Sequence, residues 1–428
     1  MIRTIDECFW GIQNGANIKQ SKSSGGFPIT RIETIADNKF NRDRVGYAGI
    51  TDVSSYESYI LEDEDLLMSH INSAKYLGRT VLYNRRANEV IIHGMNLLRL
   101  RANKEIINPS YAKYLFSGCK FKKQVSRITK KSVNQASFTV GDLKKIKISV
   151  PSILEQVQIV EKLDKIAGII ELRQAEIEKA EEIIKARFIE VFGDPVLNSM
   201  KWEEHKLSEY ILFMTSGSRG WSKYFTDDGS EVFITIKNVK NNKITLKEIQ
   251  FVNAPDDKEA KRTKVQAGDL LISITADLGR TGVVSNEIAK QGAYINQHLS
   301  LIRLDVSKIN PHFVSYYLET EAGKRQFASK NQSAVKAGLS FESIKSLKIF
   351  VPPMELQRDY VLFTEQADKS KLPNTSIIYT LFVGMAYTLP GTLALYLCAK
   401  LSPVNGDMGV PFQVRSRYFS RLAVLKLS

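Results

Sequence analysis

The sequence predicts an α+β protein in which two similar domains, each a mixed β-sheet with short helices, are joined by a long coiled-coil helix. Two observations carry this prediction: an uninterrupted helical pattern from Glu155 to Val191, and short segments before it that return in the same order after it. A repeat on this scale is far longer than a solenoid repeat, so the two copies are expected to be domains. We expect domains at residues 1–152 and 196–352, a spacer helix at 153–195, the start of a second spacer helix at 353–371, and an atypical apolar tail at 372–428.

The predicted spacer helix contains no Pro and a single Gly, and its apolar residues step by threes and fours. That spacing forms one stripe with a period near 3.5 residues, the seam of a coiled coil. The principal seam residues are Ile159, Leu163, Ile166, Ile170, Ile177 and Ile184. Arg173 and Arg187 interrupt the seam. Gly193-Asp194-Pro195 is expected to end the helix, because Gly suits a left-handed cap and Pro cannot continue.

Six short segments recur on the two sides of this helix in the same order and at nearly constant spacing. The pairs are Asp65-Leu66-Leu67 with Asp269-Leu270-Leu271, Gly78-Arg79-Thr80 with Gly279-Arg280-Thr281, Leu98-Arg99-Leu100 with Ile302-Arg303-Leu304, Ile107-Asn108-Pro109 with Ile309-Asn310-Pro311, Lys147–Pro151 with Lys348–Pro352, and Gln156 with Gln357. Chance can produce one or two such matches. Six in order indicate an internal duplication.

Composition indicates a globular protein with an anionic partner. The chain has 428 residues, of which 43% are hydrophobic and 25% charged, and its formal net charge is +14. Such a charge favours nucleic acid or a membrane surface as partner, with a solvated basic surface as the alternative. The three cysteines (Cys8, Cys119 and Cys398) are too few and too widely spaced for a disulfide framework or a Cys-based zinc site, and they fit a reducing cytoplasm. No secretory signal is expected in Met1–Gly15, which lacks an apolar segment.

A polar loop rich in small and charged residues opens each copy, at Gln13–Phe27 and at Thr215–Gly229. Each loop is followed by a predicted strand, Pro28–Ile35 in the first copy and Glu231–Val239 in the second. Such loops place basic, amide, hydroxyl and aromatic side chains where they can reach phosphates or base edges. The candidate DNA-binding residues here are Lys22, Arg219, Lys223 and Tyr224. An exposed loop with solubilising charge is the alternative for each of them.

The repeated Gly-Arg-Thr turn carries one arginine in each copy, Arg79 and Arg280. In the second copy it follows an alternating strand predicted at Leu270–Thr275. An arginine next to a glycine turn can contact a phosphate or a guanine, which makes both residues candidate DNA-binding residues. It can equally hold the turn together through its own hydrogen bonds, and we favour that structural role.

A basic polar segment follows in each copy, at Lys122–Gln135 and at Lys324–Lys336. Each is followed by a predicted short helix with a Ser or Thr cap and by a strand that ends in Pro. The segments mix charge with amides, the side chains that contact phosphates and base edges. Their candidate DNA-binding residues are Lys130, Lys131, Asn134, Gln135, Lys330, Asn331, Gln332 and Lys336.

No catalytic residue, metal site or cofactor is expected. The five histidines show no metal-binding spacing, and no Walker loop, G-x-S-x-G motif or nuclease signature is found. Asn108-Pro109-Ser110-Tyr111 resembles the N-P-P-Y motif of amino-methyltransferases, but a helix capped by Asn with Pro in its first position explains it more simply. No Gly-rich loop after a strand is present to hold S-adenosylmethionine, so we favour the cap.

The arrangement resembles the specificity subunit of type I restriction-modification systems. The residues that carry the resemblance are Val150-Pro151 with Gln156, Val351-Pro352 with Gln357, and Phe192-Gly193-Asp194-Pro195, together with the repeated segments; it covers about Phe27 to Lys371. The resemblance implies two target-recognition domains, each recognising half of a bipartite double-stranded DNA site, held apart by paired helices. It also implies that modification (methyltransferase) subunits dock on those helices, and restriction subunits through them. The six seam residues are therefore the candidate partner-binding residues of a non-catalytic, cytoplasmic subunit.

Two departures from this family pattern stand out. The second copy opens with Lys201–Leu207, for which the first copy has no clear counterpart, so the first domain is expected to be abbreviated or divergent. The second long helix gives way after Lys371 to a different kind of sequence, whose Ile377–Leu401 is apolar and long enough to span a bilayer. A membrane anchor, an aberrant end and a buried hairpin are the alternatives, and we favour the aberrant end. A silent specificity cassette and a membrane-associated scaffold are the alternative functions, with membrane association the less expected.

Overall fold

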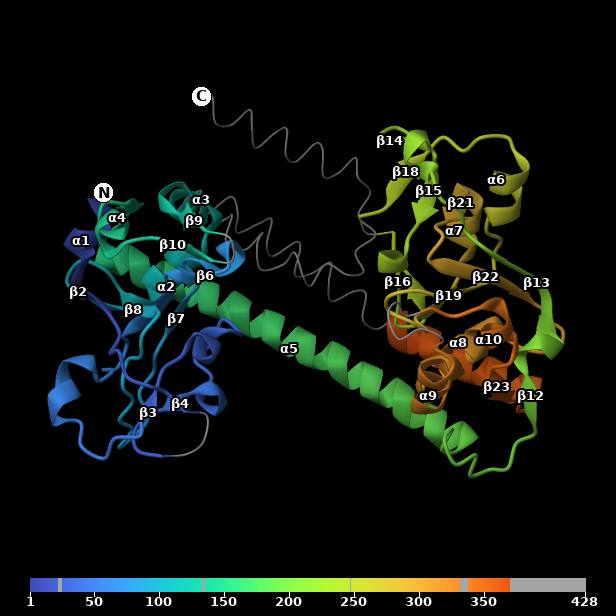
Figure 1. The fold of residues 1–428 in the computed structure, drawn as a ribbon, viewed down its shortest axis with the longest axis horizontal. Helices are drawn as coiled ribbons and strands as arrows, with labels where there is room; N and C mark the ends of the chain where they lie inside the picture. Colours follow the sequence, from blue (N-terminus) through green and yellow to red (C-terminus); the bar gives the residue numbers. More distant parts are fainter. Residues whose placement is uncertain (22–24, 133–134, 247, 332–337, 370–428) are drawn as a thin grey trace. The chain divides into compact units, whose positions relative to one another are not determined.

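The computed structural model describes residues 1–21, 25–132, 135–246, 248–331 and 338–369. The chain divides into two compact units; within the described residues, unit 1 comprises 1–172 and unit 2 comprises 173–369 (Figure 1). The long helix α5 (Ile153–Phe192) begins in unit 1 and ends in unit 2. The predicted fold class, two similar α+β domains with a long helix between them, is confirmed. The apolar tail predicted at 372–428 lies outside the described residues.

Unit 1 is built on a four-stranded antiparallel sheet. In spatial order its strands are β2 (Phe9–Asn14), β8 (Leu97–Ala102), β5 (Leu66–Ser69) and β7 (Thr80–Leu82). Smaller pairings join β1 (Ile2–Thr4) to β11 (Lys147–Ser149), β3 (Pro28–Ile29) to β4 (Gly46–Tyr47), and β6 (Ile71–Asn72) to a hairpin of β9 (Lys130–Lys131) and β10 (Ala136–Ser137). The helices are α1 (Ile5–Cys8), α2 (Pro109–Ser117), α3 (Cys119–Ile128) and α4 (Val140–Lys144). One face of the sheet packs with these helices and the first half of α5 into the main core.

Unit 2 repeats this sheet and adds a second, mixed one. The repeated sheet has, in spatial order, β13 (Ile211–Ser216), β22 (Leu299–Leu304), β19 (Leu270–Ser273) and β20 (Thr281–Val283). The second sheet has β14 (Phe225–Thr226), β18 (Gln250–Val252), β15 (Glu231–Ile234) and β21 (Ala293–Ile295), of which β15 and β21 run parallel. Two further pairs are β12 (Glu204–Lys206) with β23 (Lys348–Phe350) and β16 (Val239–Lys240) with β17 (Lys243–Ile244). The helices are α6 (Lys258–Thr263), α7 (Asn286–Gln291), α8 (Pro311–Glu319), α9 (Glu321–Ser329), α10 (Phe341–Lys345) and a last one at residues 354–369.

Strand order confirms the internal duplication. The first strand of each four-stranded sheet even has its irregularity at the matching place, between Phe9 and Gly11 in unit 1 and between Ile211 and Phe213 in unit 2. The first domain is divergent and not abbreviated at its start, because β1 pairs with β11 as β12 pairs with β23. The two opening strands share no residue. Strand pairing is made by backbone groups, so their sequences can diverge while the pairing persists.

One of the predicted segment matches is shifted by two residues. Leu66 pairs with Leu100 in unit 1, and its counterpart Leu270 pairs with Ile302 in unit 2. The residue equivalent to Arg303 is therefore Arg101 and not Arg99. A strand repeats every two residues, so the alternating run around Arg99 and Arg101 matches its partner in either register.

The strands predicted at Pro28–Ile35 and Glu231–Val239 are shorter than expected, since β3 ends at Ile29 and β15 at Ile234. A 3-10 turn follows each of them. The side-chain oxygen of Thr34 accepts a hydrogen bond from the amide of Arg31 at 2.9 Å, and Asn238 does the same for Thr235 at 2.9 Å. Such local side-chain bonds compete with the ladder of a sheet and end the strand.

The Asn-Pro segments are helix caps, as we favoured. The side chain of Asn108 accepts a hydrogen bond from the Tyr111 amide at 3.0 Å, and Pro109 begins α2. Asn310 caps α8 in the same way through the His312 amide at 2.9 Å. These asparagines satisfy free amides at a helix start, which explains the motif without a methyltransferase site.

The two repeated glutamines tie the start of each spacer helix to these caps. Gln156 Oε1 accepts a hydrogen bond from the Asn108 amide at 2.7 Å, and Gln357 Oε1 accepts one from the Asn310 amide at 2.9 Å. The side-chain NH2 group of each glutamine also donates a hydrogen bond to a backbone carbonyl just before its own helix. Both side chains are fully buried. The Val-Pro-x-x-x-x-Gln motif is therefore a structural joint between a domain and the helix that leaves it.

The core of unit 1 contains two histidines and an arginine where unit 2 has only aliphatic residues. By strand and bridge positions, His70, His93 and Arg99 correspond to Ile274, Ile295 and Leu301. Burial lowers the pKa of His70 to about 4. Burial, helped by the charge of Arg99, lowers the pKa of His93 to about 3.

Unit 1 is expected to lose more stability on acidification than unit 2, in which burial lowers the pKa of one histidine, His312. In the unfolded chain a histidine takes up a proton near pH 6.5, whereas the folded unit keeps both rings neutral down to about pH 4. Between these values each histidine lowers the free energy of unfolding by up to about 1.4 kcal/mol for every unit by which the pH falls. Hydrogen exchange of amides in β5 and β8, compared with β19 and β22 at pH 7 and pH 5, measures both units in one sample.

The change His70→Ile with His93→Ile copies the residues of unit 2 and should flatten the pH dependence of unit 1. A dependence that survives this change would assign it to other groups.

Candidate nucleic-acid interface

Three candidates of unit 1 lie together on one exposed hairpin. Lys130 and Lys131 form β9, and Gln135 directly precedes β10. All three side chains are exposed. The amide and hydroxyl of Ser132 donate to the Gln135 carbonyl at 2.8 and 2.9 Å and close the turn. Lys22 and Asn134 lie outside the described residues.

The arginines of the two Gly-Arg-Thr turns both have partners within their own unit. The guanidinium of Arg79 donates to the Ala36 carbonyl and lies 4.5 Å from the centre of the Tyr76 ring. Arg280 forms an ion pair with Asp277. These contacts support the structural role that we favoured, and a DNA contact by either arginine remains a prediction.

The loop candidates of unit 2 differ in exposure. Arg219 is exposed. Tyr224 is half-buried, with its ring edge-on to Trp221 at a centroid distance of 5.8 Å, so packing explains most of its position. The ammonium of Lys223 lies 4.8 Å from the centre of the Tyr224 ring.

The candidates after α9 have local partners too. Lys330 donates to the hydroxyl of Ser346 at 2.8 Å, and the side chain of Asn331 accepts from the Gly338 amide at 3.1 Å. Gln332 and Lys336 lie outside the described residues. The described candidates of unit 2 therefore do not form a single cluster as those on the β9–β10 hairpin do.

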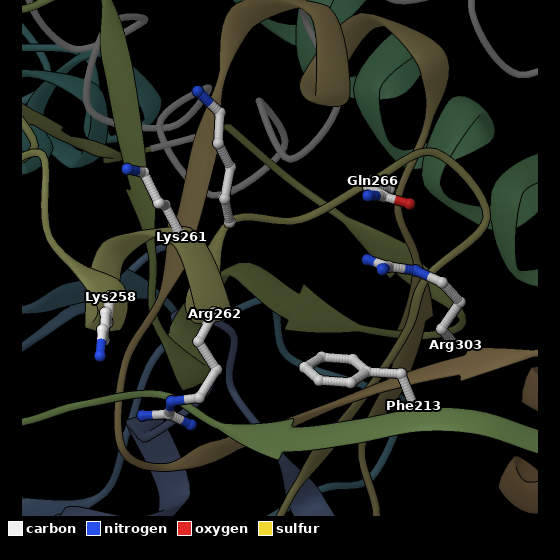
Figure 2. A pocket seen from close by; sticks show the side chains of 7 residues that line it. Phe213, Lys258, Lys261, Arg262, Gln266 and Arg303 are labelled. Carbon is white, nitrogen blue, oxygen red and sulfur yellow. The ribbon is translucent and has the colours of Figure 1, made fainter.

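A pocket of about 430 Å³ in unit 2 gathers cations that the sequence analysis did not select. It lies where α6 approaches the paired strands β13 and β22. Figure 2 shows Phe213 between Arg262 on one side and Arg303 on the other. The lining residues are Phe213, Lys258, Lys261, Arg262, Lys264, Gln266 and Arg303. Five of the seven are cationic and none is acidic.

Carboxylates outside the pocket compensate three of these five cations. Arg303 forms a two-pronged pair with the buried carboxylate of Asp269, at 2.8 Å for each nitrogen. Lys264 pairs with Glu231 at 2.9 Å, and this hydrogen bond raises the pKa of Lys264. Lys261 pairs with Asp256 at 2.7 Å, but both side chains are largely exposed, so that pair is weak. Lys258 and Arg262 have no ion-pair partner among the described residues.

Arg262 is held in place by neutral groups, so its charge stays uncompensated. Its guanidinium donates to the Thr215 hydroxyl, to the Ser216 carbonyl at 2.9 Å and to the Ser218 hydroxyl at 3.3 Å. These three residues begin the polar loop predicted at Thr215–Gly229. A fixed guanidinium with spare donors is suited to bind a phosphate group.

A local signal for this pocket was present in the sequence. The run Lys258-Glu259-Ala260-Lys261-Arg262-Thr263-Lys264 carries four cations immediately before the Gly-Asp turn of β19. It has no basic counterpart in the first copy, so a search for repeated features passed over it. Arg303 belonged to a repeated segment but was interpreted only as evidence of duplication.

Comparison with known proteins agrees with the duplicated architecture. The family model described as the type I restriction modification DNA specificity domain matches the chain twice, at residues 3–182 and 200–378. The chain belongs to this family. The MjaX type I restriction enzyme specificity subunit of Methanocaldococcus jannaschii is 29% identical over 370 residues, covering 83% of this chain and 84% of the relative. The EcoBI specificity subunit of Escherichia coli is 21% identical over 386 residues, covering 83% and 76%.

A solved structure shows the same fold. The S subunit of a type I restriction-modification system from M. genitalium superposes with a TM-score of 0.53 at 16% identity, covering 93% of this chain and 95% of that one. The protein is thus a type I specificity subunit with two target-recognition domains, which correspond to the two sheet-containing units.

The seam of α5 in this specificity subunit packs largely against the subunit's own domains. Ile159, Leu163 and Ile166 are buried in the core of unit 1, with Ile170 packed against it, and Ile184 is buried in the core of unit 2. Ile177 is half-buried. The binding of another subunit by these residues remains a prediction, and the side of α5 that lies open carries other residues.

Neither a metal site nor a membrane span is found in the described part of the specificity subunit. The described residues contain no group of three or more His, Cys, Asp or Glu side chains placed to hold a metal ion. Among the same residues, no helix combines the length and apolarity needed to cross a bilayer. The apolar stretch Ile377–Leu401 lies outside them.

Proposed function

We propose that this specificity subunit recognises a bipartite double-stranded DNA site, one half with each target-recognition domain, and that α5 sets the spacing of the halves. The observation that carries the proposal is the repetition of one strand order on both sides of a single 40-residue helix. Such a helix is about 60 Å long, and one turn of B-DNA is about 34–36 Å. The net charge of +14 supports affinity for the phosphate backbone.

Methyl transfer belongs, in this proposal, to modification subunits that dock on the helical spacer in the cytoplasm, and cleavage belongs to restriction subunits that join through the modification subunits. The specificity subunit itself has no catalytic role and needs no cofactor. Large apolar side chains that stay exposed along α5 support a docking surface; they are Leu154, Val157, Leu172, Ile183 and Ile189.

The proposal predicts a bipartite methylated motif in cells that contain this chain and its modification subunit. Each domain contacts a short stretch of DNA, so two short sequences separated by an unspecified gap should be methylated throughout the genome. Single-molecule sequencing of genomic DNA measures this directly. Deletion of the gene, with the modification subunit kept, is the control and should abolish the motif.

A continuous motif would contradict two separate half-sites. A motif that persists after deletion would assign recognition to another chain, and no motif at all would remove the proposed function. Purification of the chain with its modification subunit checks the docking surface separately, because that association does not require DNA.

A further inference from the structure

The cationic pocket of unit 2 has a positional counterpart in unit 1. Lys264 forms a bridge with Tyr294, and Ile60 forms the equivalent bridge with Ile92. The next amides also match, Val265 donating to the Ala293 carbonyl at 2.9 Å and Leu61 to the Ile91 carbonyl at 3.0 Å. The 3-10 helix η3 (Ser54–Tyr59) of unit 1 therefore occupies the place of α6.

Charge is reversed between the two places. The pocket residues Lys258, Lys261, Arg262, Lys264 and Gln266 correspond to Ser54, Glu57, Ser58, Ile60 and Glu62. Unit 2 thus has four cations and no carboxylate at these positions, whereas unit 1 has two carboxylates and no cation. Both units keep the bridge and the next amide bond, while the side chains at these five positions differ in the sign of their charge.

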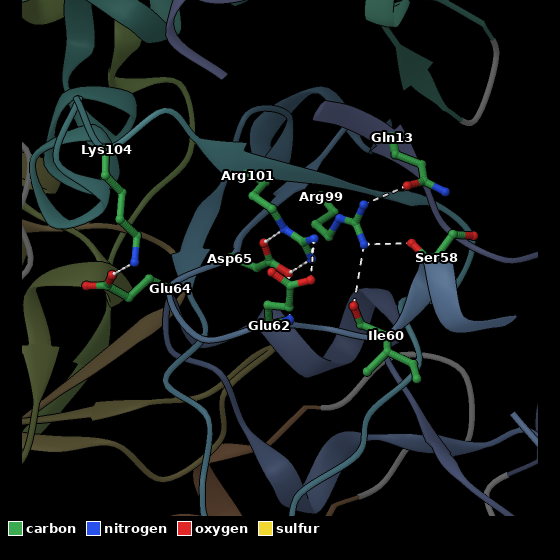
Figure 3. Close-up of polar contacts among 9 residues, drawn as sticks. All are labelled: Gln13, Ser58, Ile60, Glu62, Glu64, Asp65, Arg99, Arg101 and Lys104. Carbon is green, nitrogen blue, oxygen red and sulfur yellow. Dashed lines mark hydrogen bonds and ion pairs between the residues drawn. The ribbon is translucent and has the colours of Figure 1, made fainter. Parts of the chain in front are cut away.

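The arginine shared by both places also differs in what surrounds it. Figure 3 shows the carboxylates of Asp65 and Glu62 next to each other, both bonded to the guanidinium of Arg101. The Glu62 carboxylate lies 2.5 Å from Nη1. Arg303 keeps the pair with Asp269 but has Gln266 at the position of Glu62. One wall is missing in unit 1 as well, because Gly11 takes the place of Phe213 and its Cβ position faces open space. In unit 1 two carboxylates therefore pair with the arginine, and a glycine stands where unit 2 has the apolar side chain.

We propose that the pocket between α6 and strands β13 and β22 binds a phosphate group, supplied by the DNA backbone, and that unit 1 has no such site. The inference rests on the proposed function in that DNA is the source of the phosphate. Lys258 and Lys261 meet the group from α6, and the anchored guanidinium of Arg262 orients it. The two domains then contribute unequally to the electrostatic affinity for DNA. The pocket of unit 2 binds the DNA backbone beside the polar loop, and the corresponding place in unit 1 does not bind it.

The test removes the two exposed lysines from the full-length chain as Lys258→Gln with Lys261→Gln. Binding of a duplex with the methylated motif and of an unrelated duplex is measured by fluorescence anisotropy between 50 and 300 mM salt, about the range in which counterion release is resolved. The slope of log affinity against log salt is negative, and each lost phosphate contact reduces its magnitude by about 0.9. We therefore expect the magnitude of the slope to fall by about 1–2 for both duplexes.

The matched control is Lys290→Gln with Lys308→Gln, which removes the same charge from the same unit. Both lysines are exposed, and Lys308 pairs with Asp305 at 3.3 Å as Lys261 pairs with Asp256. The reciprocal variant Ser54→Lys with Glu57→Lys places the missing cations on unit 1 and should increase the slope.

A slope that falls in the pocket variant and not in the control supports the site. Equal slopes in the two variants overturn it, because net charge then explains the effect, and an unchanged slope in the pocket variant overturns it as well. The methylome tests the proposed function separately: a missing motif with a pocket-specific slope change rejects bipartite recognition and keeps the phosphate site.

Discussion

Replacing Phe192 by Ala is expected to lower the free energy of unfolding of unit 2 by about 3–5 kcal/mol, as for other fully buried phenylalanines. Phe192 is the last residue of α5 and is 0% exposed. Its ring centre lies 5.0 Å from those of Phe188 and Phe313 and 5.4 Å from that of Tyr360. The truncation leaves a cavity at the point where the spacer helix, the repeated helix α8 and the helix at 354–369 converge.

Urea denaturation followed by tryptophan fluorescence measures this effect selectively. Trp221 in unit 2 is 5% exposed, and Trp202 donates its indole hydrogen to the Phe192 carbonyl at 2.9 Å. Trp10 in unit 1 is already 73% exposed in the folded chain, so the spectral shift reports mainly unit 2. Ile189→Ala on the same helix and in the same unit is the control, since that side chain is 53% exposed and should change stability by less than about 0.5 kcal/mol. Similar losses in the two variants would show that the aromatic cluster does not anchor α5.

Replacing Asp269 by Ala is expected to destabilise unit 2 by about 2–4 kcal/mol, because removing one partner of a buried pair leaves the other uncompensated. The carboxylate of Asp269 is 1% exposed and accepts from two nitrogens of Arg303 and from the Gln266 amide at 2.7 Å. The guanidinium of Arg303 retains some access to water, which places the expected loss below that of a fully buried pair.

Asp256→Ala is the control for this change, because that carboxylate is 87% exposed and solvent screens its pair with Lys261. The same urea titration compares the two variants. If Asp269→Ala and Asp256→Ala agree within about 0.5 kcal/mol, the repeated aspartate has some purpose other than stability. Asp65→Ala should reproduce the loss in unit 1, since Asp65 binds Arg101 through the same two nitrogens.

Much of the architecture was predictable from the sequence because its signals are local. Helical periodicity located α5, and Gly193, with φ of +79°, ends it where the Gly-Asp-Pro segment predicted. The position of Asn108 and Asn310 directly before Pro predicted the starts of two helices. Six ordered matches predicted the duplication that the strand order confirms.

The candidate interface was predicted less completely, because charged residues that meet on a surface follow no periodic pattern in the sequence. Lys130, Lys131 and Gln135 lie within six residues of the sequence and share a hairpin. Phe213, Arg262 and Arg303 are separated by dozens of residues and meet only through the folding of unit 2. The repeat pattern does not indicate the pocket either, because most of the pocket residues differ between the two copies.

The sequence by itself determined that two related α+β domains flank a long helix, because helix periodicity, capping and repetition are written along the chain. Only the tertiary structure decided that Arg101 and not Arg99 matches Arg303, that the first domain keeps its opening strand, and that one domain has four cations in a place where the other has two acids. Strand register, backbone pairing and the convergence of distant side chains depend on neighbours in space, which a linear pattern with a period of two residues does not specify.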